Sequence, residues 1–502
     1  MTTTEPSAHP LTRLSRLSPV WTAVVISCVL SLLRILQNPI LNDDAYGYLR
    51  AAELFASDGA DAVFSQYSWY SYSILIALFD PILPGGLVAS AHVLNTLLLA
   101  ALVGAFVTLC RELQPGSRIA WLAALTILLF PMLNEMRFMV IRDFGFLAGA
   151  LWSLLFLLRY QQSAYWQHAL YWCGALLLAT AFRLEALLLL AVAPMALIGT
   201  PRKSVILYAV MLAVLAVLAI LCLLLQLDVL ALIKYSYRYY LPQLTQLPSV
   251  LSTNADALGQ TLFTADNEPG SSNTPHSLVI LLFAYGFSVL TNLAQAISVP
   301  VSILLLHAAW RGWLRRAVQG RAPLLIYIAC SALSLLVFIS IMHFLTQRYA
   351  TLLSLLLLLL VPGVLNRWYE HAVTQHKVRR LQYVAGFFCF YYVVDSLISF
   401  GHSRAYLGEA LVWTQANVPA DAPFITNHRY LAYESGRVGD YDKVQSSLTE
   451  TMAKLTPNAS LALALKSHDA EARMMLERDT RLTLLQNFSN ARGDEVRIYS
   501  VH

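Results

Sequence analysis

Two adjacent carboxylates, Asp43 and Asp44, stand in the stretch Leu-Asn-Asp-Asp-Ala-Tyr at 41–46, just after the first long apolar run. An isolated ionised carboxylate is costly to bury, so acids beside membrane helices usually face a cavity, a partner charge or a substrate. An acid pair can take a proton from a hydroxyl group or hold a divalent cation. We therefore take Asp43 and Asp44 as the candidate catalytic residues, and this argument does not rank them.

Other charged and aromatic residues fall at the ends of apolar runs on the same expected side. Arginine and lysine can cradle a phosphate, so we expect a donor-phosphate or metal-binding set there. Its members are Glu135, Arg142, Asp143, Arg183, Lys234, Arg238 and Arg348. The expected acceptor or sugar contacts are Tyr46, Tyr67, Trp69 and Tyr70. The alternative is that the charges are interfacial anchors or internal ion pairs and that the aromatic residues form a belt.

The composition shows what must position these residues. Of 502 residues, 58% are hydrophobic and 13% charged, against about 25% charged in soluble domains. The chain is therefore predicted to be a polytopic α-helical membrane protein, and its net charge of +5 is not evidence for nucleic-acid binding. About eleven transmembrane helices are expected, at about 20–37, 85–109, 119–134, 138–158, 165–181, 184–199, 204–226, 277–306, 323–343, 350–366 and 381–400. The six cysteines lie in or beside apolar runs and show neither metal spacing nor a disulfide framework.

The basic residues orient this map. With the N-terminus inside, the inside loops hold Arg13, Arg16, Arg111, Arg118, Arg159, Arg202, Lys203, Arg311, Arg315, Arg316, Arg321, Arg367, Lys377, Arg379 and Arg380. The outside loops hold Arg50, Arg137, Arg142, Arg183, Lys234, Arg238 and Arg348. Because cytoplasmic loops are enriched in Lys and Arg, this distribution predicts a cytoplasmic N-terminus, retained as an anchor helix, and an odd number of spans.

The last hundred residues differ from the rest. In 401–502 charge rises and no apolar run could span a bilayer, while strand patterns appear at Phe424–Thr426 and Val496–Val501. We expect a small C-terminal α/β extracytoplasmic domain there, following a membrane domain at 1–400. The membrane domain would carry two outside loops, at about 38–84 and 227–276.

At these residues the chain resembles the GT-C superfamily of membrane glycosyltransferases, whose members include protein O-mannosyltransferases, the lipid A aminoarabinose transferase and lipopolysaccharide core galacturonosyltransferases. The resemblance covers most of the membrane part. It rests on Asp43-Asp44-Ala-Tyr, Tyr67-Ser-Trp-Tyr, the turn with Glu135, Arg137, Arg142 and Asp143, Arg183-Leu-Glu185, and Gln347-Arg348-Tyr349. The tail stretches Ile425-Thr426-Asn427 and Tyr433–Arg437 add to it. The chain departs from the family in having Ser71 after Trp69-Tyr70, where a proline is often found.

The resemblance implies an inverting transfer of a sugar from a polyprenyl-phosphate donor to a glycolipid, glycan or protein acceptor. The first-loop acid would be the base, and alignment with the family favours Asp43. A divalent cation is used by some members and not by others, so it stays open here. The implied location is the bacterial cytoplasmic (inner) membrane, with the C-terminal domain in the periplasm. Alternatives are a polysaccharide ligase or polymerase, a solute transporter, or a non-catalytic scaffold.

Overall fold

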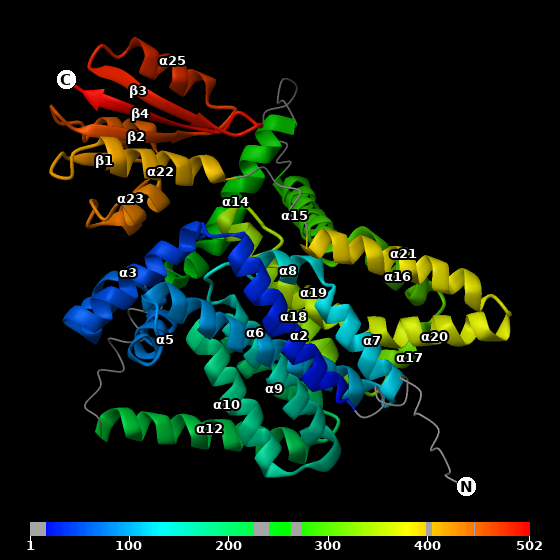
Figure 1. The fold of residues 1–502 in the computed structure, drawn as a ribbon. Coiled ribbons are helices and arrows are strands. Elements are labelled where there is room, and N and C mark those ends of the chain that lie inside the picture. Colours follow the sequence, from blue (N-terminus) through cyan, green and yellow to red (C-terminus); the bar gives the residue numbers. More distant parts are fainter. Residues whose placement is uncertain (1–16, 225–239, 263–273, 398–403, 446) are drawn as a thin grey trace, which may run out of the picture.

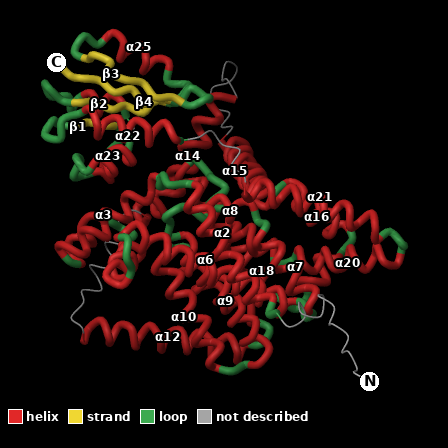
Figure 2. The backbone as a smooth tube through the Cα atoms, viewed as in Figure 1, coloured by secondary structure: helices red, strands yellow, loops and turns green. Residues whose placement is uncertain are grey.

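The computed structural model describes residues 17–224, 240–262, 274–397, 404–445 and 447–502. These residues are mostly helical, with one small sheet near the C-terminus (Figures 1 and 2). Seven helical segments among them are long and apolar enough to cross a membrane. They are α2 (Pro19–Gln37), α6 (Gly86–Leu113), α9 (Asp143–Ser163), α12 (Pro201–Leu224), α15 (Thr274–Ile297), α18 (Ala322–Met342), and α19 (Thr351–Leu358) continued by α20 (Val361–Thr374).

Several apolar runs expected to be single spans are broken in the structure. The run 277–306 is divided at Ser298, whose φ is +82°, into α15 and α16 (Val299–Trp310). The run 184–199 contains α11 (Ala186–Val192) and a 3-10 turn at Ala193–Leu197 that includes Pro194. Proline lacks the N–H that a continuous helix needs. The number of spans therefore stays a prediction.

The remaining membrane-part helices are shorter or less apolar. They are α3 (Asp43–Asp58), α4 (Ala60–Gln66), α5 (Tyr70–Phe79), α7 (Ser117–Leu128), α8 (Pro131–Met136), α10 (Trp166–Phe182), α14 (Tyr240–Leu262), α17 (Trp313–Val318) and α21 (Val378–Leu397). The expected first outside loop is thus largely helical, because α3, α4 and α5 fill it.

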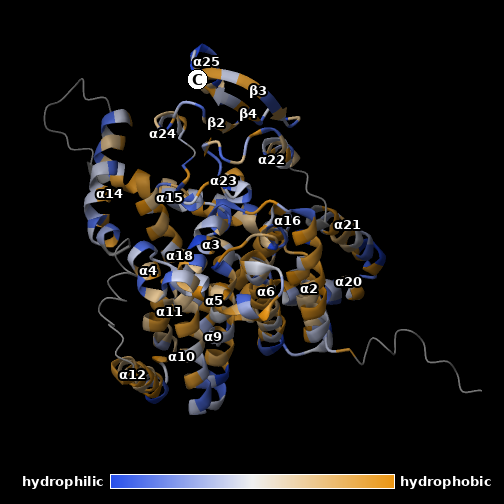
Figure 3. Cartoon of the chain, turned by 60° about the vertical axis from the view of Figure 1, so that its left-hand side comes forward, coloured by the Kyte–Doolittle hydropathy of each residue, from blue (hydrophilic) through white to orange (hydrophobic). Residues whose placement is uncertain are grey.

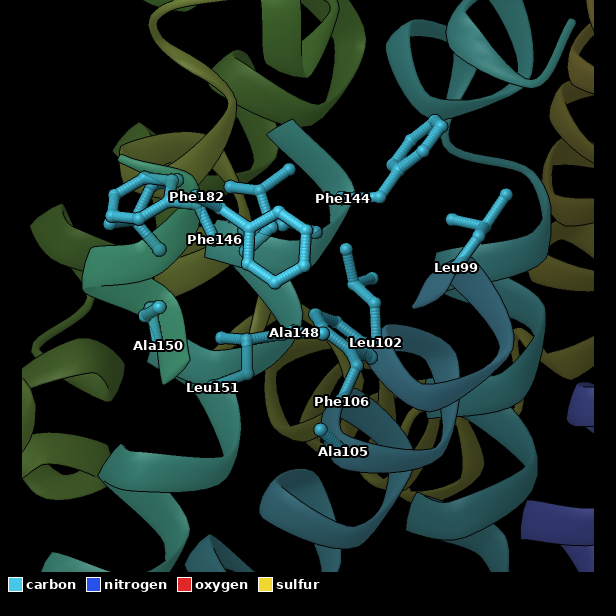
Figure 4. Packing of buried hydrophobic residues seen from close by; sticks show 14 of the residues in the cluster. Leu99, Leu102, Ala105, Phe106, Phe144, Phe146, Ala148, Ala150, Leu151 and Phe182 are labelled. Carbon is cyan, nitrogen blue, oxygen red and sulfur yellow. The ribbon is translucent and has the colours of Figure 1, made fainter. Parts of the chain in front are cut away.

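The centre of the helical part is α9, which packs against both α6 and α10. A Cβ atom on Gly149 would lie 2.8 Å from the Ala175 carbonyl oxygen, so the glycine permits the close approach of α9 and α10. Side chains from all three helices interlock there, among them Phe106, Phe144 and Phe182 (Figure 4). This packing fixes the end of α10 beside the start of α9, where Arg183 and Asp143 lie.

The periphery of the helical part has the opposite character. Only 6% of the apolar window of α12 is buried, against 83% for α9, and hydrophobic residues cover most of α12 (Figure 3). A helix that is apolar all round and unburied by protein suits contact with lipid.

Residues 405–501 contain the sheet. Its strands are β1 (Phe424–Thr426), β2 (Ser460–Leu465), β3 (Leu482–Ser489) and β4 (Glu495–Val501), in the order β1-β2-β4-β3. β1 pairs parallel with β2, and β4 pairs antiparallel with both β2 and β3. The helices of this part are α22 (Ala405–Asn417), α23 (Arg429–Ser435), α24 (Leu448–Met452) and α25 (Ala470–Arg478). Strands β1 and β4 coincide with the two stretches whose patterns indicated strands.

One segment of this C-terminal part enters the core of the helical part. Ala432, Tyr441 and Val444 belong to the same buried cluster as Tyr46 and Leu49 of α3. In Figure 1, α23 lies directly beside the start of α3. The C-terminal part therefore rests on the helix that begins with the two acids.

Candidate active site

Helix α3 begins at the acid pair itself. Asp43 and Asp44 form its first turn, where negative charge is favoured by the helix dipole. The preceding residue, Asn42, fixes this end in space. Its amide donates to the Val140 carbonyl oxygen over 3.3 Å, and its side-chain oxygen accepts from the Val140 N–H over 2.8 Å. This two-way bond ties the start of α3 to the chain just before Asp143.

An alternating chain of charges runs from Asp44 into the protein. Arg348 Nη1 lies 2.6 Å from Asp44 Oδ2, and Arg348 Nε lies 4.0 Å from Asp143 Oδ2. On the far side of Asp143, Arg183 Nη1 lies 2.5 Å from Oδ1, and Arg183 Nη2 lies 2.5 Å from Glu185 Oε1. The five side chains come from four separate parts of the chain, and we call them the ion chain.

The ion chain is buried in its middle and more exposed at both ends. The Asp143 side chain is 6% exposed and that of Arg183 10%, whereas those of Asp44 and Glu185 are 43% and 35% exposed. Charges in the buried middle interact strongly because little water screens them. Aromatic faces complete their surroundings, since the Arg183 guanidinium lies 5.3 Å from the ring centre of Phe146 and 5.2 Å from that of Tyr349.

Asp43 has different neighbours from Asp44. Its side chain is exposed, and it forms no ion pair with any residue in the described ranges. The C-terminal part approaches it instead, because Arg429 Nη1 donates to the Asp43 carbonyl oxygen over 3.1 Å. The neighbouring His428 is half-buried, and burial lowers the pKa of its ring, which the charge of Asp43 partly offsets. The carboxylate of Asp43 is therefore not held in an ion pair among the described residues, and it lies between the helical part and the C-terminal part.

A cavity of about 500 Å³ lies at the Arg183–Glu185 end of the ion chain. Arg183, Glu185 and Tyr349 form its polar end, and its walls are mostly apolar side chains of α11 and α18. Along α18 these wall residues extend from Cys330 to Met342, which is about 18 Å at 1.5 Å per residue. The cavity is therefore an elongated apolar pocket with a guanidinium group at its polar end.

A solved structure with a similar arrangement of helices identifies the fold. An oligosaccharyltransferase from Archaeoglobus fulgidus, solved with zinc and sulfate, matches 88% of this chain and 68% of its own, with a TM-score of 0.52 and 15% identity. The chain has the GT-C fold. ArnT from Cupriavidus metallidurans matches over 96% of this chain and 97% of its own at a TM-score of 0.42 and 11% identity. No protein-family model and no curated protein matches the sequence.

Several predicted site residues are not among the five side chains of the ion chain. Glu135 is exposed on α8, and its charge acts on Arg34 of α2. The guanidinium of Arg142 lies 5.5 Å from the ring centre of Trp69. Lys234 and Arg238 fall outside the described residues.

Two predicted sugar contacts touch the tail. Tyr46 is fully buried, and its ring centre lies 5.6 Å from that of Tyr433 and 6.4 Å from that of Tyr441. The Tyr67 hydroxyl donates to Asp442. Tyr70 packs on Phe64, with ring centres 4.4 Å apart. Tyr46 and Tyr67 therefore join α3 and the end of α4 to the C-terminal part, and their contact with a sugar or acceptor stays a prediction.

Sequence reasoning did not assign Asn42, His428 or Arg429 to the site. Asn42 could have been suspected as a helix N-cap, since Asn is favoured before acids at a helix start. His428 and Arg429 directly follow the Ile425-Thr426-Asn427 stretch. Nothing in the sequence places them beside Asp43, which lies 385 positions before His428. Only the fold brings the two segments together.

A divalent cation was left open by the sequence, and the described residues offer no cluster of three metal-ligating side chains. No group of three or more His, Cys, Asp or Glu side chains within those ranges could hold one. Asp44 and Asp143 each have an arginine on their oxygens, so binding a cation would require those pairs to open. We derive no chemical step through a metal.

Proposed function

We propose that this protein is an inverting glycosyltransferase that takes its sugar from a polyprenyl-phosphate donor. The observation that carries the proposal is the meeting of three features at one place. These are a carboxylate at Asp43 that forms no ion pair among the described residues, two guanidinium groups held by acids, and an elongated apolar cavity whose polar end is lined by Arg183. The GT-C fold supports the reaction class, although a fold alone does not fix function.

The cavity and the ion chain suit the two halves of such a donor. Isoprene units would lie against the apolar walls of the cavity. The phosphate would lie at its polar end, beside Arg183 and Arg348. When the glycosidic bond breaks, the departing phosphate gains negative charge. Guanidinium groups already held in place by Asp143, Asp44 and Glu185 would stabilise that charge without reorganising.

Asp43 would be the general base. An acceptor hydroxyl attacks the anomeric carbon and gives its proton to Asp43, while the bond from that carbon to the phosphate oxygen breaks on the opposite face. The polyprenyl phosphate leaves with the electron pair of that bond. Asp44 would instead orient Arg348, because its Oδ2 atom is already engaged there. Inversion at the anomeric carbon follows from this single displacement.

The same proposal sets the orientation in the membrane. The start of α3, the start of α9 and the end of α10 would face the periplasm of the bacterial inner membrane, with residues 401–502 as a domain on that side and 1–400 as the membrane domain. A glycolipid, glycan or protein acceptor would approach beneath the tail. Trp69 and Tyr70, near Arg142, would line its entrance.

The test compares the surface glycans of a strain lacking this protein with those of its parent. Mass analysis of glycolipids and lipopolysaccharide should show one sugar missing, restored by the unmodified protein. Asp43→Asn should lose transfer by about 10²–10⁴-fold, and Asp44→Asn by less. Asp61→Asn, which alters an exposed acid of the neighbouring α4, is the matched control and should behave as the parent. Full activity of a well-expressed Asp43→Asn variant would overturn the assignment of the base.

A further inference from the structure

A second, larger cavity lies on another side of the helical part. It measures about 950 Å³ and is enclosed by α7, α16, α20 and α21. It shares no lining residue with the cavity at Arg183. Its walls are almost entirely apolar, with Leu125 of α7, Leu304 of α16 and Phe388 of α21 among them. Nothing in the proposed transfer reaction uses it.

The lining residues give this cavity a direction. At one end lie the start of α7, the end of α16 and the start of α21, marked by Arg118, His307 and Gln382. At the other end lie Leu129 and Phe130, where the chain leaves α7 towards the active site. From Arg118 to Leu129 is about 17 Å at 1.5 Å per residue. Half of a bilayer hydrocarbon core is about 15 Å thick, so the cavity has the depth of one leaflet.

The end marked by Arg118 is strongly basic. The three segments that form it, 111–118, 307–321 and 366–380, contain ten Arg and Lys residues but only two acids, Glu112 and Glu370. Glu112 binds Arg159, and Glu370 accepts from the Asn366 amide. A cluster of cations beside an apolar groove is complementary to a lipid with an anionic head.

Arg118 is held ready for such a head group by neutral partners. Its guanidinium lies 4.5 Å from the ring centre of Tyr369, and its Nη1 atom donates to Asn366 Oδ1 over 3.3 Å. No acid within the described ranges forms an ion pair with it. The residue is exposed, so its remaining N–H groups can reach a phosphate. His307 beside it lies between Trp310 and Trp313, with ring centres 6.0 and 6.1 Å away, as aromatic residues do at the level of lipid head groups.

We propose that this groove is a binding site for one anionic phospholipid, with its acyl chains along α7, α16, α20 and α21 and its phosphate at Arg118. The lipid comes from the leaflet on the side away from Asp43, the expected cytoplasmic side. The bound lipid stabilises the positions of the surrounding helices, because the ends of its acyl chains contact Phe130 and Leu358, which line the groove. Phe130 directly precedes α8, and Leu358 is the last residue of α19, the helix that begins just after Arg348.

The experiment measures which lipids the purified full-length protein retains. The protein is placed in nanodiscs of phosphatidylcholine with a minor share of phosphatidylglycerol of the same chain length, then released and weighed intact by native mass spectrometry. Retained lipid should be enriched in phosphatidylglycerol. Arg118→Gln should reduce that enrichment about fivefold, as expected for one cation at an anionic head. Arg202→Gln, an exposed arginine at the start of α12, is the matched control and should change nothing.

A second pair of variants tests the groove itself. Leu125 is 42% exposed and lines the groove, whereas Leu97 of α6 is 51% exposed and does not. Leu125→Trp should block the acyl chains and remove retained phosphatidylglycerol, and Leu97→Trp should leave retention as it was. Both changes are at partly exposed positions, so the fold tolerates them. Equal retention of the two lipids by the unmodified protein, or undiminished retention in Leu125→Trp, would overturn the proposal.

Discussion

Arg137 and Arg183 both stand at turns on the same expected side of the membrane, yet the structure gives them different surroundings. Arg137 is 2% exposed and donates only to neutral groups, namely Asn134 Oδ1, the Ser27 carbonyl and hydroxyl oxygens, and the Ser31 hydroxyl. Arg183 lies between two carboxylates and lines a cavity. Arg137 therefore links α2 to α8, whereas Arg183 places one end of the ion chain beside a cavity.

The difference shows what separates a structural arginine from one that can act on a ligand. Arg137 is 2% exposed and its hydrogen-bond partners among the described residues are all neutral, so it neither faces open space nor belongs to a chain of charges. At Arg183 the two acids fix the guanidinium from behind, while its other side faces the cavity. Burial alone does not distinguish the two residues, because the Arg183 side chain is only 10% exposed. The arrangement of partners does.

The largest effect that this comparison predicts is on transfer in Arg183→Met. Removing a fixed cation from a developing phosphate charge should lower the turnover number about 10²–10³-fold. Because Asp143 and Glu185 lose their partner, stability should also fall, so Arg183→Lys is made beside it to keep one positive charge. We expect Arg183→Lys to fold as the parent and still to transfer slowly, since a lysine cannot bridge both acids. Parental turnover in either variant would remove Arg183 from the site.

The matched change, Arg137→Met, should lower stability and leave turnover almost unchanged. Arg137→Met leaves the Asn134 and serine groups without their donor, which should lower the free energy of unfolding by about 1–3 kcal/mol. Transfer per folded molecule should stay within about twofold of the parent, as for changes outside a site. The measurements are a denaturation titration in detergent and turnover normalised to monodisperse protein. Loss of turnover at unchanged stability would show that Arg137 acts on the substrate.

The sequence alone is enough to group the charges but not to pair them. Asp44, Asp143, Arg183 and Arg348 all lie where apolar runs end on one side, and this shared position predicts that they lie near one another. The structure places these four in one ion chain. Which acid meets which base depends on the rotation of each helix, and hydropathy does not report rotation. The partners of Arg137 on α2 are more than a hundred residues earlier and are serines, which carry no signal of their own.

For the fold too, the sequence predicts the kind and place of many elements but not where helices break or which elements meet. The helical membrane character follows from long apolar runs, and the positions of β1 and β4 follow from alternation. The breaks at Ser298 and at Pro194 escape such a prediction, because hydropathy remains high across them and each run looks continuous. The contact of α23 with α3 escapes it too. Contacts between segments almost 400 residues apart need the fold, or a resemblance, to be found.

The smallest predicted effect concerns the link between the tail and the first loop. The Tyr67 hydroxyl donates to Asp442, whose side chain is buried at 9% relative exposure. In Tyr67→Phe that carboxylate loses its donor, so we expect the docking of 428–444 on α3 to weaken by about 1 kcal/mol. Hydrogen exchange of the amides in 428–444 should then rise about fivefold. Because Arg429 holds the Asp43 carbonyl, KM for the acceptor should rise while the turnover number changes little.

The control for this variant is Tyr165→Phe, at a tyrosine that is 65% exposed and lies just before α10. Unchanged exchange in Tyr67→Phe would mean that the aromatic contacts of Tyr46 with Tyr433 and Tyr441 hold the tail without this bond.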